Sequence, residues 1–294
     1  MPDAIFKRLL VPIADAGDAE ATSEILASMH THLSELFVVH IASEDEATAS
    51  GLSAHAHIFE PFESITSTQV KVETAVEFCT EPMDTISSLA ADYEPTAIAV
   101  RPRDRSPLRG FFSGTETTSL VQGTATPVVV LPEALAVSTP GKNFSLVVPL
   151  DGSDRAFEAL RFACEQFDDP TIIALHVVSD PKTELYTELT PHLSTTDEQT
   201  DHAERVRANE LFGRAHEIVD EHDGTIETYT LGGNVARAIN QTAVELDADG
   251  IVFQRKPVGP GKSDTEEQAS SDISVIGDTI TTLITDAPVP VYIR

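Results

Sequence analysis

The sequence has no tryptophan, two cysteines and three methionines among its 294 residues. Cys79 and Cys164 fit neither a disulfide framework nor a zinc-binding pattern, and we expect both to be small buried core residues. No apolar run approaches the roughly 20 residues that cross a bilayer. The apolar stretch before Asp15 is too short for a signal peptide, so we expect a cytoplasmic protein without a membrane span.

Basic residues are also scarce. The chain has 19 Lys and Arg against 48 Asp and Glu, for a formal net charge of −29, and only six of its basic residues are lysine. Nucleic acid and anionic membranes require a basic surface, so the composition argues against both as partners. Acid-rich, lysine-poor surfaces suit molar salt, where charges are screened within about 3 Å. The composition therefore predicts adaptation to high salt.

The sequence contains an internal duplication, because four segments of the first half return in the same order in the second half. They are KRLLVPI (7–13) with FSLVVPL (144–150), LFVVHIAS (36–43) with IIALHVVS (172–179), AIAV (97–100) with GIVF (250–253), and TSLVQGTATPVVVL (118–131) with TTLITDAPVPVYIR (281–294). This order predicts two domains, residues 1–135 and 144–294. Residues 136–143, which contain proline and glycine, form the expected linker.

Within each copy, short Val/Ile/Leu runs alternate with helical patterns, which predicts a doubly wound α/β fold with a parallel sheet. We expect strands at 7–13, 35–42, 70–76, 96–101 and 127–131, and again at 145–150, 171–178, 225–231, 249–254 and 289–293. We expect helices at 81–92 with Thr80 as N-cap, at 115–123, at 202–221, and at 235–246 after an Asn234 cap. Residues 46–66 contain Gly51 and Pro61, which predicts a short or irregular helix.

Ligands of such sheets bind beyond the carboxyl ends of the strands, where the strand order reverses. Asp151 follows the first strand of the second copy and could accept hydrogen bonds from an adenine amine or a ribose hydroxyl. The alternative is that Ser153 or Asp154 simply caps the next helix.

The first copy carries a basic loop after its fourth strand, with four arginines within residues 101–109 followed by Gly114 and Thr115. A helix N-terminus beside guanidinium groups is a natural anion site. The alternative is that these arginines pair with surface acids such as Asp104 and Glu116.

In the second copy the corresponding loop contains Gly-Pro-Gly-Lys-Ser (259–263), which lacks the full phosphate-loop spacing and is interpreted as a flexible loop. Asp278, at the start of the next helix, would repel phosphate. His40 and His176 recur at the ends of the second strands and are interpreted as structural. The sequence shows neither a metal-ligand pattern nor a catalytic set, so we expect no metal requirement and no enzymatic activity.

The chain resembles the universal stress protein family in its tandem two-domain form. The resemblance rests on VPLDGSDRAFEAL (148–160), LHVV (175–178) and APVPVYI (287–293), and in the first copy on VPI (11–13), VVHI (38–41) and TATPVVVL (124–131). It implies two five-stranded parallel sheets of order 3-2-1-4-5. It also implies that the last strands pair between the copies, giving a pseudo-twofold unit within one chain, and it leaves a further homodimer open.

Some family members bind ATP through an Asp after strand one and a G-x-x-G-(nine residues)-G-[ST] loop after strand four. In the first copy Gly114 and Thr115 match, but Arg101 and Asp104 replace the first glycines and Ala14 replaces the Asp. In the second copy Asp151 matches, but Gln254 and Pro257 replace glycines and Asp278 replaces the Ser/Thr. Each copy therefore keeps a different half of the site, so tight ATP binding at both is not expected. The resemblance favours weak binding of ATP or AMP through the basic loop of the first copy.

The resemblance also implies which residues would contact a nucleotide. In the first copy the base would meet Pro12, Ile13, Ile41 and Val100, and the phosphates would meet Arg101, Gly114, Thr115 and Glu116. In the second copy Pro149, Leu150 and Asp151 would surround the base and ribose, with Val177 and Phe253 as walls. The functional hypothesis is a stress-response regulatory protein that senses a nucleotide or another small anion. The alternative is a protein-interaction module that binds no nucleotide and docks to a partner protein.

Overall fold

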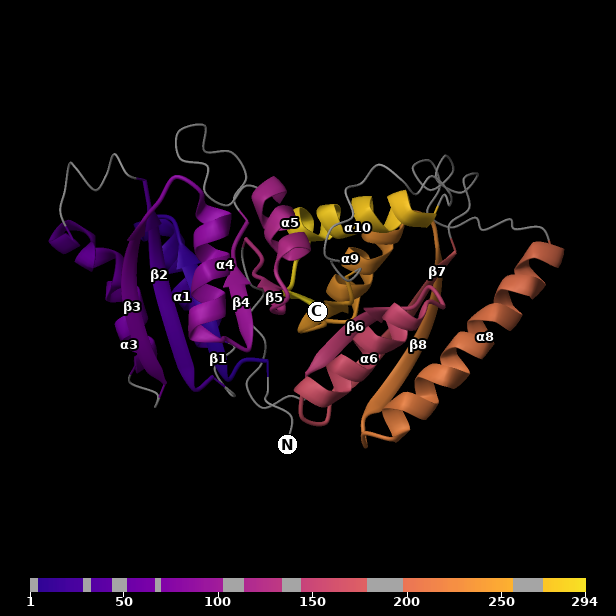
Figure 1. The fold of residues 1–294 in the computed structure, drawn as a ribbon. Helices are drawn as coiled ribbons and strands as arrows, with labels where there is room; N and C mark the ends of the chain where they lie inside the picture. Colours follow the sequence, from indigo (N-terminus) through magenta and orange to yellow (C-terminus); the bar gives the residue numbers. More distant parts are fainter. Residues whose placement is uncertain are drawn as a thin grey trace.

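The computed structural model describes residues 5–28, 33–43, 52–66, 70–102, 114–133, 144–178, 198–255 and 272–294. Its strands form one ten-stranded sheet in the order β3-β2-β1-β4-β5-β10-β9-β6-β7-β8 (Figure 1). The first half contributes β1 Arg8–Ile13, β2 Glu35–Ala42, β3 Lys71–Phe78, β4 Ala97–Val100 and β5 Val128–Val130. The second half contributes β6 Ser145–Pro149, β7 Thr171–Val178, β8 Thr225–Gly232, β9 Gly250–Phe253 and β10 Val291–Ile293.

Each half therefore has the order 3-2-1-4-5 that the family resemblance implied, with all pairs inside a half parallel. The two sheets are continuous because β5 and β10 pair antiparallel, with Val129 opposite Tyr292. This pairing between the last strands of the two copies was also predicted. It gives the chain its pseudo-twofold arrangement.

Helices cover both faces of the sheet and divide the core into two layers. On one face lie α1 Ala16–Ser28, η2 Leu52–Phe62 (a 3₁₀ helix), α3 Glu63–Thr66, α6 Asp154–Gln166 and α8 Glu198–Asp220. On the other face lie α4 Pro82–Tyr93, α5 Gly114–Gly123, α9 Val235–Glu245 and α10 Asp272–Asp286. The central strands are buried on both faces, which explains their uninterrupted apolar sequences, whereas the edge strands β3 and β8 are largely accessible.

The residues at the helix starts determine where the helices begin, and they test the predicted caps. Asn234 caps α9 as predicted, because its Oδ1 accepts a hydrogen bond from the Arg237 N–H at 3.0 Å. The prediction of Thr80 as the cap of α4 is wrong. Pro82 fixes the first helical position, so the cap is Glu81, whose side chain makes no capping hydrogen bond. The irregular helix predicted near 46–66 is confirmed over residues 52–66, where Pro61 lies inside a 3₁₀ segment.

An aromatic cluster joins the two halves near the amino ends of the strands. Phe167, which follows α6, lies with its ring centroid 5.8 Å from Phe6, 5.2 Å from Tyr292 and 5.1 Å from Phe144. Phe6 also packs edge-on against Tyr292 at 5.6 Å. Because Phe6 precedes β1 and the other three rings belong to the second half, the cluster fixes one copy against the other.

Arg255 makes a second connection between the halves, near the carboxyl end of β9. Its guanidinium donates to the carbonyl of Val121 at 2.6 Å and to that of Thr126 at 3.4 Å, at and just beyond the C-terminal end of α5. A cation there stabilises the negative end of the helix dipole. Burial of the guanidinium lowers the pKa of Arg255 from its usual value.

The tight packing at Gly250 gives a testable prediction. A Cβ at this position would overlap Cε2 of Tyr292, so Gly250→Ala should lower the free energy of unfolding by about 1–3 kcal/mol through overpacking. Gly213 is the matched control, because no heavy atom lies within 4 Å of its Cβ position in α8. Gly213→Ala should raise stability by about 0.5–1 kcal/mol, since alanine is the better helix former. Urea unfolding followed by circular dichroism measures both effects, and equal losses would contradict the packing at Gly250.

The two cysteines are both free, and only one is fully in the core. Cys164 is buried, and desolvation raises the pKa of its thiol to about 11. Cys79 is half-buried, so the prediction that both thiols are core residues holds for Cys164 alone.

Candidate functional site: two unlike strand-tip crevices

The strand order reverses between β1 and β4 in the first half and between β6 and β9 in the second. The strand register is the same in both places, with Leu9 opposite Ala97 and Leu146 opposite Gly250. These are the points where ligands bind in open α/β sheets. In each half the expected ligand position lies between the helix that follows the first strand and the end of the fourth strand, and this position is called the mouth of the crevice below.

A hydrogen-bonded turn forms one side of the mouth in the first half. Asp15 caps α1 by accepting a hydrogen bond from the Asp18 N–H at 3.0 Å. Asp18 in turn accepts one from the Ala14 N–H at 3.0 Å through Oδ2. This reciprocal arrangement, similar to a capping box, holds Asp18 in the interior at 1% exposure.

Arg101 reaches this carboxylate from the end of β4. Its Nε lies 3.4 Å from Oδ1 of Asp18, and the two side chains are 11% and 2% exposed. The sequence analysis considered ion pairs between the loop arginines and surface acids such as Asp104 and Glu116. It did not identify Asp18 as a partner of Arg101. This buried ion pair therefore joins α1 to the end of β4. It also neutralises the Arg101 guanidinium, which the sequence analysis proposed as a contact for a ligand phosphate.

The apolar residues of the first half that the resemblance proposed as contacts for a nucleotide base are buried in the core. Pro12 is buried, and Ile13, Ile41 and Val100 are 0%, 0% and 1% exposed. Ile13 packs on the α1 face of the sheet, whereas Ile41 and Val100 pack on the α4 face. These four residues therefore offer no apolar surface on which a ring could stack.

The remaining candidates of the first half lie at the start of α5, which begins at Gly114 and has Thr115 and Glu116 in its first turn. Arg103, Arg105, Arg109 and Asp104 of the basic loop lie outside the described residues. The sequence analysis favoured binding through this basic loop; of its four arginines the structure describes Arg101, whose guanidinium pairs with Asp18.

The second mouth is built differently. Ser153 caps α6, since its Oγ accepts from the Ala156 N–H at 3.3 Å, as the capping alternative predicted. Asp151 Oδ1 accepts from the Ser153 N–H at 2.8 Å, yet the residue stays exposed. Gly152 between them has φ +88, a conformation that favours glycine. Capping thus uses Ser153 and leaves the Asp151 carboxylate at the surface.

The proposed base walls of the second half also differ from those of the first. Leu150 is buried at 2% exposure, but Pro149, Val177 and Phe253 are half-buried. Val177 and Phe253 pack on the same core layer as Ile41 and Val100. An accessible apolar surface therefore lies at the strand tips of the second half, beside an exposed carboxylate.

The repeated histidines hold the strand tips in place, as predicted. His40 Nδ1 lies 3.3 Å from the Ile13 carbonyl, and His176 Nδ1 lies 2.8 Å from the Leu150 carbonyl. A carbonyl only accepts, so Nδ1 donates in both rings. Each buried ring thereby ties the second strand of its half to the end of the first.

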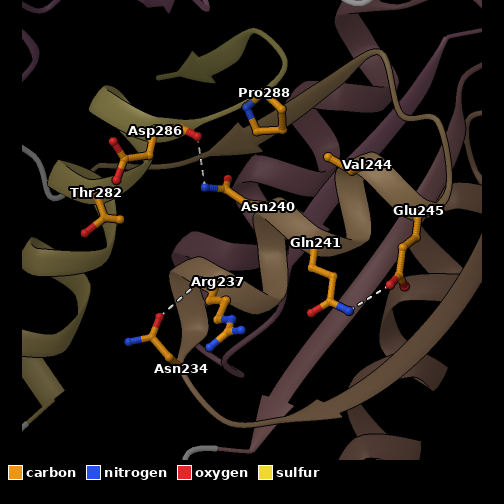
Figure 2. Close-up of a pocket in the computed structure, with 9 residues that line it drawn as sticks. All are labelled: Asn234, Arg237, Asn240, Gln241, Val244, Glu245, Thr282, Asp286 and Pro288. Carbon is orange, nitrogen blue, oxygen red and sulfur yellow. Dashed lines mark hydrogen bonds between the residues drawn. The ribbon is translucent and has the colours of Figure 1, made fainter. Parts of the chain in front are cut away.

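A separate groove of about 610 Å³ lies between α9 and α10 (Figure 2). Its lining residues are Asn234, Arg237, Asn240, Gln241, Val244, Glu245, Thr282, Asp286 and Pro288. Asn240 of α9 donates to the Asp286 carbonyl of α10 at 3.2 Å and so bridges the groove, whereas Gln241 donates to Glu245 at 2.7 Å within α9. None of the residues that the sequence nominated lines this groove.

In the described part of the chain, no three His, Cys, Asp or Glu side chains lie together so that they could hold a metal ion. None of the helices described there is long and apolar enough to cross a membrane.

Comparison with known proteins decides the family. The model of the universal stress protein family matches residues 5–132 and again residues 143–293. The chain belongs to the universal stress protein family. Its two matches coincide with the two structural halves, so this is a tandem universal stress protein. A search of curated proteins finds no significant relative.

Solved structures agree on the tandem fold. A universal stress protein from Archaeoglobus fulgidus superposes with a TM-score of 0.60 at 16% identity, over 98% of this chain and 96% of that one. A universal stress protein from Pseudomonas aeruginosa UCBPP-PA14 gives 0.59 at 13% identity, over 98% and 92%. The cytoplasmic domain of a prokaryotic cation chloride cotransporter gives 0.50 at 9% identity, over 98% and 94%. At these identities the likeness concerns the fold.

Proposed function

We propose that this tandem universal stress protein is a cytoplasmic stress-response regulator that senses an adenine nucleotide through the crevice of its second half. The observation that carries the proposal is the difference between the two mouths. The second half leaves Asp151 exposed and Val177 and Phe253 partly accessible, whereas the matching apolar residues of the first half are buried beneath a bridged mouth. A flat apolar ring and a hydroxyl-bearing ribose suit such a combination of apolar walls and one convergent carboxylate.

The sequence after the fourth strand of the second half favours a monophosphate over ATP. The segment between β9 and α10 carries no net positive charge, because Arg255, Lys256 and Lys262 balance Asp264, Glu266 and Glu267, and Asp278 stands where nucleotide-binding relatives have Ser or Thr. The prediction that Asp278 lies at a helix start is wrong, because α10 begins six residues earlier at Asp272. A carboxylate in place of the Ser or Thr hydroxyl would still repel added phosphate charge. We therefore propose AMP as the better ligand and weak binding of ATP.

The working conditions are part of the proposal. A formal net charge of −29 strains a compact chain by self-repulsion, and molar salt screens that repulsion. We propose that the protein functions in high salt, so ligand titrations belong in molar potassium chloride as well as in dilute buffer.

Calorimetric titration of the intact protein with AMP tests this function. Asp151→Ala should weaken AMP binding at least about tenfold, because a hydrogen bond to a charged group contributes about 1.5–3 kcal/mol. Asp168→Ala is the matched control, since it removes the same charge from an exposed position between α6 and β7, at the amino ends of the strands. Equal AMP affinity in the Asp151 and Asp168 variants would overturn the assignment of this crevice.

Absence of saturable heat with millimolar AMP or ATP would instead favour the second candidate, a docking module. The open groove between α9 and α10, with Val244 64% exposed on its lining, is the surface that this alternative would use (Figure 2). The tandem fold in the cytoplasmic domain of a cotransporter is compatible with such a role.

A further inference from the structure

The duplication places equivalent helices, α4 and α9, on the same face of the sheet, after the third strand of each half. Ile86 and Ala90 of α4 correspond to Ile239 and Ala243 of α9, and all four side chains are buried in the same core layer. The sides of the two helices that face away from the sheet can therefore be compared position by position.

The outward side of α9 carries a row of four exposed side chains at helical spacing. They are Arg237, Gln241, Val244 and Glu245, and all four line the groove between α9 and α10 (Figure 2). Arg237 and Glu245 each lie four residues from Gln241, so the two charges are about 12 Å apart along the helix. The row thus carries opposite charges at equal distances from its centre.

Such a row is complementary to itself when two copies of the helix meet antiparallel. A twofold axis through Gln241 would place Arg237 against Glu245 of the partner subunit, and Glu245 against the partner's Arg237. Arg237 is available for this contact, because no carboxylate of the described residues lies within ion-pair distance of its guanidinium.

The contact would also cover an exposed apolar side chain. Val244 is 64% exposed, more than any other large hydrophobic residue in the described part of the chain. In the antiparallel arrangement it would lie against the methylene stem of the partner's Arg237, which removes apolar surface of both side chains from water.

The equivalent row of α4 has the opposite property. It consists of Asp84, Ser88, Ala91 and Asp92, all of them exposed. The same antiparallel contact between two copies of α4 would bring Asp84 against Asp92 of the partner subunit, and two carboxylates repel each other. The duplicated chain therefore contains one helix face that favours a second copy and one that opposes it.

We propose that two chains form a homodimer through antiparallel contact of their α9 helices, and that the groove between α9 and α10 receives side chains of the partner subunit. With a formal net charge of −29 on each chain, two copies repel one another overall, so a face with both signs of charge decides where they meet. An isologous contact of this kind closes at two chains. The dimer goes beyond the proposed nucleotide function and does not depend on it.

Sedimentation equilibrium of the intact protein in molar potassium chloride, where the net repulsion is screened, tests the dimer. Wild type should dimerise with rising protein concentration. Val244→Glu should weaken the dimer at least about tenfold, because it brings two added carboxylates into the contact. Ala91→Glu is the matched control, since it adds the same charge at the equivalent position of α4, and it should associate as wild type does.

An exchange of charges tests the antiparallel arrangement. Arg237→Glu should weaken the dimer at least about tenfold, whereas Arg207→Glu, the same charge change at an exposed position of α8, should leave it unchanged. The double variant Arg237→Glu/Glu245→Arg should return to within about threefold of wild-type association, because opposite charges again face each other across the axis. The two positions are too far apart to contact each other within one chain, so this recovery requires the partner subunit.

Each contrary result overturns a defined part of the proposal. A monomer at every concentration overturns the dimer and leaves the groove to a different protein. Equal weakening by Val244→Glu and Ala91→Glu overturns the α9 contact, and a double variant as weak as Arg237→Glu overturns the antiparallel arrangement. None of these results changes the expected binding of AMP, and unchanged circular dichroism spectra verify that each variant folds.

Discussion

Replacing Phe167 with alanine should lower the free energy of unfolding by about 3–5 kcal/mol, the usual cost of removing a fully buried aromatic ring. Phe167 is 4% exposed and is the ring that contacts Phe6, Phe144 and Tyr292. Its loss removes the centre of the aromatic cluster that joins the two halves, and the cavity has rigid strands on one side that cannot close it. Equilibrium urea unfolding followed by circular dichroism measures the effect.

Tyr292→Phe is the control for this prediction, since it removes one oxygen and keeps the ring. The Tyr292 hydroxyl is buried without a hydrogen-bond partner, and its desolvation raises the pKa of the phenol. Removing an unsatisfied polar atom should leave stability unchanged or slightly increased. A loss in Tyr292→Phe as large as that in Phe167→Ala would show that the hydroxyl, rather than ring packing, holds the halves together.

The second large effect is expected at the bridged mouth of the first half. Asp18→Ala should cost about 3–5 kcal/mol, because it leaves the guanidinium of Arg101 in the interior without its carboxylate. It also removes the acceptor for the Ala14 N–H. The same urea unfolding experiment provides the measurement.

A double-mutant cycle with Arg101→Gln identifies the cause. If the bridge carries the effect, Asp18→Ala should cost much less when Arg101 is already glutamine, with a coupling energy of about 1–3 kcal/mol. Additive losses in the double variant would mean that Asp18 stabilises the turn at Ala14 alone and that the mouth is not held by the ion pair.

Most of the fold could be predicted from local sequence, because the same strand and helix patterns occur in both copies. Every strand was expected within a few residues of its observed bounds. The pairing of β5 with β10 was expected from the family resemblance, and it agrees with the apolar sequences of these two last strands. The cap at Asn234 and the irregular helix around Pro61 are also local effects. Thr80 failed as a cap because the proline two residues later fixes where α4 begins.

The site was less predictable because its decisive contacts join distant parts of the chain. An aspartate in the first turn of a helix, such as Asp18, ordinarily faces solvent, and only the tertiary fold brings Arg101 to it. Arg255 reaches across 134 positions to the carbonyl of Val121. One signal was available in the sequence: compared with the first copy, the second copy has Gln254 in place of Arg101 and no acidic residue in place of Asp18. The two differences together indicate an ion pair in the first copy and its absence in the second.

The number of AMP molecules bound per chain tests the central claim most directly. Calorimetric titration of the wild-type protein should give one site per chain, because the partly accessible apolar residues Val177 and Phe253 and the exposed Asp151 belong to the second half, whereas the equivalent apolar residues of the first half are buried. Two sites of similar affinity would contradict the account, since they would require the Asp18–Arg101 bridge to open for ligand. A stoichiometry of zero would contradict it as well.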